Sequence, residues 1–222
     1  MIMNKCFDKI YLSWRIGKGY PRIMVGMIEE RSSGVIFRYL REGVDEAVQY
    51  GFRGYPGLSL DQTFHDKNVI ELFSKRIINF ERNDTKWLLD FWEVDESLKG
   101  DVLYMLAMTQ GKMQTDSFEF LASFIPDNGL SFVTDIAAIT HYDFNLEKLQ
   151  ESDRLTFKKE PDNPKDEKAI QVCYKNEFVG YIKKGHNEVF WGKCSDDLKI
   201  EVKSITNTPS FKELYVKIFN EK

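Results

Sequence analysis

The second half of the chain is divided into short segments in which apolar and polar side chains alternate. Residues that favour turns separate some of them, such as Lys175-Asn176 and Thr208-Pro209-Ser210. The segments are residues 130–140, 154–159, 169–174, 177–183, 199–207 and 213–218. Six short strands at regular spacing favour a closed barrel or a sandwich. We also expect one helical turn over Asn145–Gln150, with Asn145 as its cap.

The first half mixes two periodicities, so we predict an α+β domain over residues 1–124. A small antiparallel sheet is predicted from residues 9–14, 22–28 and 35–40. Helical spacing follows at Val69–Phe80, at Trp87–Trp92 after the potential cap Asp84, and at Val102–Ala107, with Asp95 as potential cap. We expect Gly111 to end the last helix and residues 116–122 to form a strand.

The boundary between two domains is predicted at Pro126-Asp127-Asn128-Gly129, where all four residues favour turns. The second domain then covers residues 129–222. The chain has a formal net charge of −4. Residues 125–222 carry 15 basic and 17 acidic side chains, and residues 1–124 carry 16 and 18, so each half has a charge of −2. Proteins that bind nucleic acid through their overall field are usually basic, so DNA binding here requires a local site.

The cysteines and histidines predict neither a disulfide framework nor a metal site. Only three cysteines occur, namely Cys6, Cys173 and Cys194, a number that fits a reducing compartment. No CxxC, HxH or HExxH spacing is present, and we expect no cofactor. Met1–Lys9 has no apolar core typical of a secretory signal, and no apolar run is long enough for a membrane span, so we expect a cytoplasmic protein.

Signatures of the common enzyme classes are also missing. Neither a GxSxG elbow nor a Walker A motif occurs, and Gly17-Lys18-Gly19 has the composition of a turn. The acidic pairs Glu29-Glu30 and Asp196-Asp197 are adjacent, so their side chains diverge and favour a solvated face. We therefore expect no catalytic activity. A nuclease or hydrolase whose metal site is formed by scattered carboxylates is the alternative.

The most informative segment is Phe157–Val172. Pro161 and Pro164 fix the backbone of a polar loop between two predicted strands and lower the entropy lost on ordering it. Asp162, Asn163 and Asp166 place two carboxylates and an amide in a small space. From composition alone, this loop is either a binding site or a set of Asx turns that satisfy their own backbone.

The order of residues in this segment resembles the motif of the HIRAN family. In that motif, a strand ending in Glu-Pro-x-Asn-Pro leads through an aspartate to Asn-Ala-Ile-x-Val. The hairpin segment Val179–Lys184 and the first strand, Phe132–Tyr142, are also similar to family segments and occur in the same order. The resemblance implies an OB-like six-stranded barrel with one or two short helices. It further implies recognition of a 3′ end of single-stranded DNA, as in accessory domains of SWI/SNF-type repair translocases and in smaller bacterial proteins.

The resemblance also implies which residues contact DNA. Asp166 matches the aspartate that contacts the 3′-hydroxyl, and Tyr142 matches the second of two paired aromatics. His141 holds the first aromatic position and can still stack on a base. The nucleic-acid-binding residues implied in this way are His141, Tyr142, Asp162, Asn163, Lys165, Asp166, Tyr181 and Lys184. Two positions depart from the family pattern, because Thr140 stands where DNA-binding members have arginine and Lys165 stands where tyrosine is common.

The N-terminal part resembles a second family more loosely. The segment Tyr55–Leu60, the helix around Phe73 and the turn Leu106–Gly111 are similar in order to the N-terminal subdomain of HipA-type toxin kinases. That resemblance implies an interaction or regulatory module that docks on a separate kinase subunit, since no catalytic-loop motif follows. An unrelated α+β domain is the alternative. The corresponding alternative function is an antitoxin-like or protein-interaction subunit in which the barrel is structural.

Overall fold

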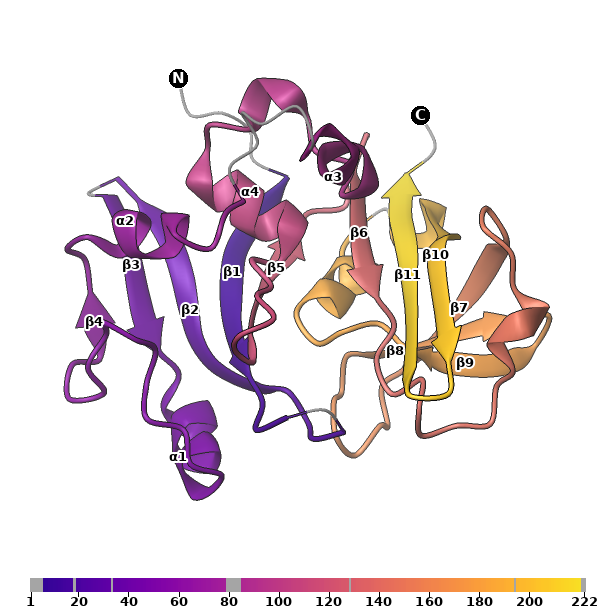
Figure 1. Ribbon diagram of the computed structural model, residues 1–222, viewed down its shortest axis with the longest axis horizontal. Coiled ribbons are helices and arrows are strands. Elements are labelled where there is room, and N and C mark those ends of the chain that lie inside the picture. Colours follow the sequence, from indigo (N-terminus) through magenta and orange to yellow (C-terminus); the bar gives the residue numbers. More distant parts are fainter. Residues whose placement is uncertain are drawn as a thin grey trace. The chain divides into compact units, whose positions relative to one another are not determined.

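The chain is described from a computed structural model that covers residues 6–17, 19–32, 34–78, 85–127, 129–193 and 195–220 (Figure 1). It divides into two compact units. One comprises Phe7–Leu89 and Val94–Ala122, and the other comprises Cys6, Asp90–Glu93 and the described residues from Ser123 onward. No helix among the described residues has the length and apolar character needed to cross a membrane.

The N-terminal unit is built on a five-stranded sheet with the order β4-β3-β2-β1-β5. Its strands are β1 (Phe7–Trp14), β2 (Ile23–Arg31), β3 (Gly34–Tyr39), β4 (Phe64–His65) and β5 (Phe118–Phe124). The predicted antiparallel sheet of the first three strands is confirmed, with Ile10 opposite Ile28 and Ile28 opposite Phe37. The predicted strand over residues 116–122 begins two residues later, at Phe118. The Asp116 carboxylate accepts a 3.1 Å hydrogen bond from the backbone amide of Phe118, which forms a turn before the strand.

The helices described between Phe7 and Ala122 are α1 (Arg41–Gln49), α2 (Val69–Ser74), α3 (Lys86–Phe91), the 3-10 turn η2 (Glu96–Leu98) and α4 (Val102–Thr109). Two predictions about them are wrong. Helix α2 ends at Ser74 and does not follow the apolar spacing further, and α4 is capped by Asp101, not by Asp95. Asp95 caps the separate turn η2, where its carboxylate accepts a 2.9 Å hydrogen bond from the backbone amide of Ser97. The predicted positions Phe80 and Asp84 lie outside the described residues.

The end of α4 follows the predicted pattern. Gln110 and Gly111 both have positive φ angles, of 60° and 50°. A Cβ atom at Gly111 would lie 2.9 Å from side-chain atoms of both Leu106 and Phe120, so glycine is required there by space as well as by conformation.

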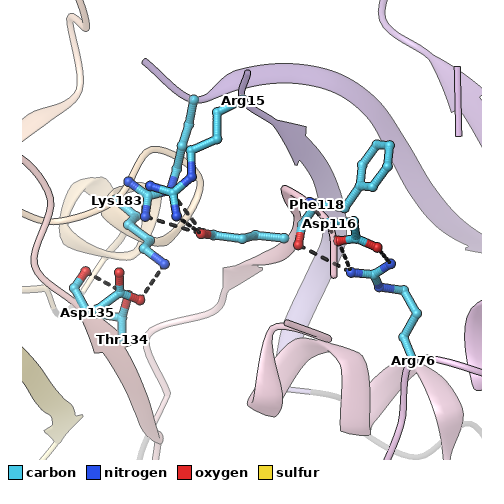
Figure 2. A network of polar contacts seen from close by, with 9 residues as sticks. Arg15, Arg76, Asp116, Phe118, Thr134, Asp135 and Lys183 are labelled. Atoms are coloured by element: carbon cyan, nitrogen blue, oxygen red, sulfur yellow. Dashed lines mark hydrogen bonds and ion pairs between the residues drawn. The ribbon is translucent and has the colours of Figure 1, made fainter. Parts of the chain in front are cut away.

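A buried arginine organises the core of the N-terminal unit. The Arg76 guanidinium makes a bidentate pair with Asp116, at 2.7 and 2.9 Å, as Figure 2 shows. It also donates to the carbonyl of Gly111 at 2.8 Å and lies within 5.8 Å of the ring of Phe118. Arg76 thus connects the end of α2 to the segment between α4 and β5, and the pairing offsets the cost of burying its charge.

The C-terminal unit contains the six predicted strands, in the order β6-β11-β10-β7-β8-β9 (Figure 1). They are β6 (Ser131–Asp135), β7 (Arg154–Glu160), β8 (Ala169–Tyr174), β9 (Glu177–Tyr181), β10 (Leu198–Thr208) and β11 (Phe211–Asn220). The 3-10 turns are η3 (Leu146–Lys148), η4 (His186–Trp191) and η5 (Ser195–Asp197). The predicted cap is confirmed, since Oδ1 of Asn145 accepts a 3.0 Å hydrogen bond from the backbone amide of Glu147. Lys175 and Asn176 have φ angles of 47° and 68°, as a two-residue hairpin requires.

The predicted closed barrel is not confirmed. Strands β7 and β10 pair only at Leu155–Ile200 and Arg154–Glu201, and β6 and β9 lie at the two edges of the sheet. Past the end of β6, Ala137 forms a bridge with Tyr181 through two backbone hydrogen bonds of 2.8 and 3.0 Å. Among the described residues, the two edges are therefore joined at one point and not along their length.

A buried ion pair lies close in sequence to the bridge between Ala137 and Tyr181. Lys183 follows β9 and forms an ion pair with Asp135 at the end of β6, as Figure 2 shows. Lys183 is 1% exposed and Asp135 is 5% exposed, so the pair lies in the core. The neighbouring Thr134 hydroxyl lies 2.9 Å from Nδ1 of the buried His186. These contacts hold β6 next to the chain that leaves β9.

Candidate nucleic-acid interface

A pocket of about 480 Å³ lies where the Ala137–Tyr181 bridge joins the edge strands. Three separate segments line it: residues 138–142 after β6, residues 163–169 between β7 and β8, and the end of β9. Six of the eight residues implied by the family motif line this pocket, namely His141, Tyr142, Asn163, Lys165, Asp166 and Tyr181. Asp162 and Lys184 are exposed and do not line it.

The backbone after β6 brings His141 and Tyr142 to the pocket. Ala138 has a positive φ of 62°, and the amide of His141 donates to the Ala138 carbonyl at 2.9 Å, which closes a turn directly after the bridge. Both aromatic side chains are exposed, and Tyr142 is 42% exposed. They are therefore accessible to a ligand in the pocket.

Asn163 organises the loop between β7 and β8. Its Oδ1 accepts from the amides of Lys165 at 2.9 Å and Asp166 at 3.3 Å, and its Nδ2 donates to Glu160 at 2.7 Å. The Asx-turn alternative is therefore correct for this residue. The same turn directs Lys165 and Asp166 towards the pocket, so the two interpretations of the loop are compatible.

Asp166 presents a partly engaged carboxylate. Its Oδ1 accepts from the amide of Lys168 at 3.0 Å, and its Oδ2 accepts from Nδ2 of Asn187 at 2.7 Å. A carboxylate has about four lone-pair positions, so these two bonds leave both oxygens able to accept one more. A ligand with a hydroxyl group can use that capacity.

The aromatic wall of the site consists of Tyr142 and Tyr181, which line the pocket, and of Phe178, which packs against both rings without lining the pocket. Tyr142 and Phe178 meet edge to face with centroids 4.5 Å apart, and Phe178 lies 5.1 Å from Tyr181. The sequence did not indicate Phe178 as a site residue. Strict alternation places positions 178 and 181 on opposite faces, but β8 and β9 shift register between Val172 and Cys173, which brings the two rings together.

Glu160 lies beneath this wall and was also not predicted. Its carboxylate accepts from Nδ2 of Asn163 at 2.7 Å, from the phenol of Tyr181 at 3.0 Å and from Nε2 of Gln171 at 2.8 Å. The hydrogen bond from Asn163, with those from Tyr181 and Gln171, holds the pKa of Glu160 below its usual value. Burial and the bond to Glu160 raise the pKa of Tyr181 to about 12. The phenol is therefore neutral, and its O–H group donates a hydrogen bond to Glu160.

One member of each adjacent acidic pair lies next to a basic side chain. Glu29 lies 2.9 Å from Arg31 on β2, and the Asp196 side chain is 95% exposed, 3.7 Å from Lys159. The part of the chain that the structure describes contains no cluster of three or more His, Cys, Asp or Glu side chains able to hold a metal ion. Cys194 lies outside that part.

The C-terminal unit is thus a six-stranded β-domain with an aromatic wall, a carboxylate and a lysine around one pocket. Residues 130–218 match the family model described as "HIRAN domain", in agreement with the motif between β7 and β8. HIRAN domains are in general nucleic-acid-binding domains that recognise 3′ ends of single-stranded DNA. No curated protein and no solved structure matches the chain. The resemblance of the N-terminal part to HipA-type kinases is not supported by these comparisons and stays a prediction.

Proposed function

We propose that this protein binds the free 3′ end of single-stranded DNA in the pocket beside Asp166, without catalysing a reaction. The observation that carries the proposal is the convergence of six motif residues from three separate segments on one pocket. We further propose that it acts in the cytoplasm, as an accessory protein of DNA repair or defence.

The chemistry of the pocket suits a terminal nucleotide. The Asp166 carboxylate can accept a hydrogen bond from a 3′-hydroxyl, whereas it repels the negative charge of a 3′-phosphate. Tyr142 and Tyr181 offer aromatic surfaces, and stacking of a base on such a ring contributes about 1–3 kcal/mol without requiring a basic domain. The net charge of −4 is therefore compatible with binding at this one site.

The departures from the family pattern have structural counterparts. Thr140 is exposed and does not line the pocket, so in our proposal it makes no phosphate contact of the kind that the family arginine makes. Lys165 does line the pocket, and in our proposal its ammonium contacts a backbone phosphate in place of the stacking surface of the usual tyrosine. The exposed Lys184 and Asp162 make no contribution to end recognition in this proposal.

The test compares labelled single strands that end in a 3′-hydroxyl or a 3′-phosphate, by fluorescence anisotropy at low salt. We expect the protein to prefer the 3′-hydroxyl strand, and we expect Asp166→Ala to lose that preference. Asp162→Ala is the matched control, because it removes the same charge from the same loop outside the pocket. Equal and negligible binding of both strands by the parent protein would sink the proposal. Cleavage of either strand on addition of Mg²⁺ would contradict the non-catalytic part.

A second role is proposed for residues 1–124 from their resemblance to the N-terminal subdomain of HipA-type kinases. In that role the unit docks on a separate kinase subunit, and the β-domain is structural. Co-purification of the tagged full-length chain with a kinase of that type tests it. A chain that binds 3′ ends and recovers no such kinase from its own cells counts against the docking role.

A further inference from the structure

A buried amide lies directly behind the Asp166 carboxylate. Asn187, the second residue of η4, is 1% exposed and does not line the pocket. Its Nδ2 donates to Oδ2 of Asp166 at 2.7 Å and to the carbonyl of Lys168 at 2.7 Å. Its Oδ1 accepts from the amide of Gly185 at 3.0 Å. The side chain therefore connects η4 to the loop between β7 and β8 at two points.

These three contacts fix the orientation of the amide. An asparagine side chain has two N–H donors and one carbonyl oxygen, and each is used here by a partner of the opposite kind. Turning the amide over would set Nδ2 against the Gly185 N–H and Oδ1 against the Lys168 carbonyl. Because unsatisfied polar groups are costly in a buried position, only one orientation is stable. The donor therefore always faces Asp166.

The orientation of Asp166 follows from that of Asn187. Oδ2 is held by the buried amide and Oδ1 by the backbone amide of Lys168, so the plane of the carboxylate is defined by two fixed donors. We propose that Asn187 is a positioning residue that sets the specificity of this site for a free 3′-hydroxyl over a 3′-phosphate. The inference rests on the proposed function, since it assigns a new residue to the same site.

The structure provides a matched control on the same helix turn. The indole Nε1 of Trp191 donates to the Lys168 carbonyl at 3.0 Å, the same oxygen that Asn187 contacts. Trp191→Phe removes that bond but leaves the bond between Asn187 and Asp166. The comparison thus separates anchoring of the loop at Lys168 from orientation of the carboxylate.

The experiment measures the ratio of the two dissociation constants, for a 3′-phosphate and a 3′-hydroxyl strand, with the full-length chain. Asn187→Ala removes the donor, and Asn187→Asp keeps the shape but sets a second carboxylate against Asp166. We expect Asn187→Ala to lower the ratio by about tenfold or more, because the hydrogen bond between the 3′-hydroxyl and the charged Asp166 is lost when Asp166 turns away. We expect Asn187→Asp to weaken binding of the 3′-hydroxyl strand, because Asp166 is then no longer held by a donor. Trp191→Phe is expected to keep the parental ratio. Near-UV circular dichroism establishes that each variant is folded.

The outcomes distinguish the inference from the function on which it rests. A parent protein with no preference between the strands overturns both. A parent with a preference that Asn187→Ala retains overturns the inference alone, and so does an equal loss in Trp191→Phe. If neither Asn187 variant folds, NMR of the parent decides. The side-chain amide resonances of Asn187 should shift on binding of the 3′-hydroxyl strand, and their invariance would overturn the inference.

Discussion

The phenol of Tyr181 donates a 3.0 Å hydrogen bond to the Glu160 carboxylate, so an aromatic surface of the pocket is held by a charged group beneath it. The same carboxylate accepts a hydrogen bond from the side-chain amide of Asn163. Asn163 in turn shapes the loop that carries Asp166. Glu160 therefore connects the stacking surface of the site to its hydrogen-bonding loop, although it does not line the pocket itself.

The first prediction concerns the titration of Tyr181. Its pKa of about 12 lies above the usual value of about 10, so the protonated phenol stabilises the fold fully below pH about 10, and this contribution is lost as the pH rises through about 12. Glu160→Gln removes the acceptor charge and should lower the pKa towards 10. NMR of labelled tyrosine, assigned with Tyr181→Phe, measures it. Glu177→Gln, at an exposed pair with Lys148, should leave the pKa unchanged.

The second prediction concerns stacking. Tyr142→Ala should weaken binding of a 3′-hydroxyl strand by about 1–3 kcal/mol, because an exposed ring at the pocket is removed. Tyr142→Phe keeps the ring and should bind nearly as the parent does. Tyr174→Ala, at the hairpin end of β8, is the control outside the pocket. Fluorescence anisotropy measures all three, and a comparable loss in Tyr174→Ala would contradict the assignment of Tyr142.

The third prediction separates the two lysines that the family motif implied. Only Lys165 lines the pocket. If its ammonium contacts a phosphate, Lys165→Ala should reduce the slope of log affinity against log salt concentration by about 0.7, the value for one contact on a single strand. Lys184→Ala should leave the slope unchanged. Binding isotherms at four or more salt concentrations give both slopes, and a larger change for Lys184 would reverse their roles.

The fourth prediction concerns the buried ion pair between Lys183 and Asp135. Lys183→Met removes the cation that pairs with the buried Asp135 carboxylate and should lower the free energy of unfolding by about 3–5 kcal/mol. Adding Asp135→Asn should recover part of that loss, since neither charge of this pair then remains. Urea unfolding monitored by circular dichroism measures both. The exposed neighbour Lys184→Met should change stability by less than about 0.5 kcal/mol.

The strands and turns of both units could be predicted because their signals are local. Alternation located all six strands of the C-terminal unit, and Lys175-Asn176 located its tightest hairpin. Helix α1 was missed because Arg41–Gln49 has few apolar residues and its N-cap, Leu40, makes no side-chain capping bond. Asp95 and Asp101 both have the chemistry of a cap, and only the break at residues 99–101 assigns them to separate turns.

The site could be predicted where the motif is continuous in sequence and not where partners are distant. The loop residues Asn163 and Asp166 follow from the motif, which also contains Glu160 without revealing its role. Asn187 lies 21 residues beyond Asp166, and no local pattern relates the two. Phe178 depends on a shift in strand register, which alternation cannot reveal. The closure of the barrel was overestimated because strand number and spacing do not determine whether the edge strands pair.

The bridge between Ala137 and Tyr181 lies at the pocket, so each of its residues serves two purposes. Tyr181 contributes both an amide to the bridge and a ring to the wall, and the turn that follows Ala137 carries His141 and Tyr142. When the bridge between Ala137 and Tyr181 opens, the residues that line the pocket therefore separate as well. A ligand bound between the two edges would stabilise this bridge, and it should slow hydrogen exchange at the backbone amides of Ala137 and Tyr181 more than at the amides of β6 and the rest of β9.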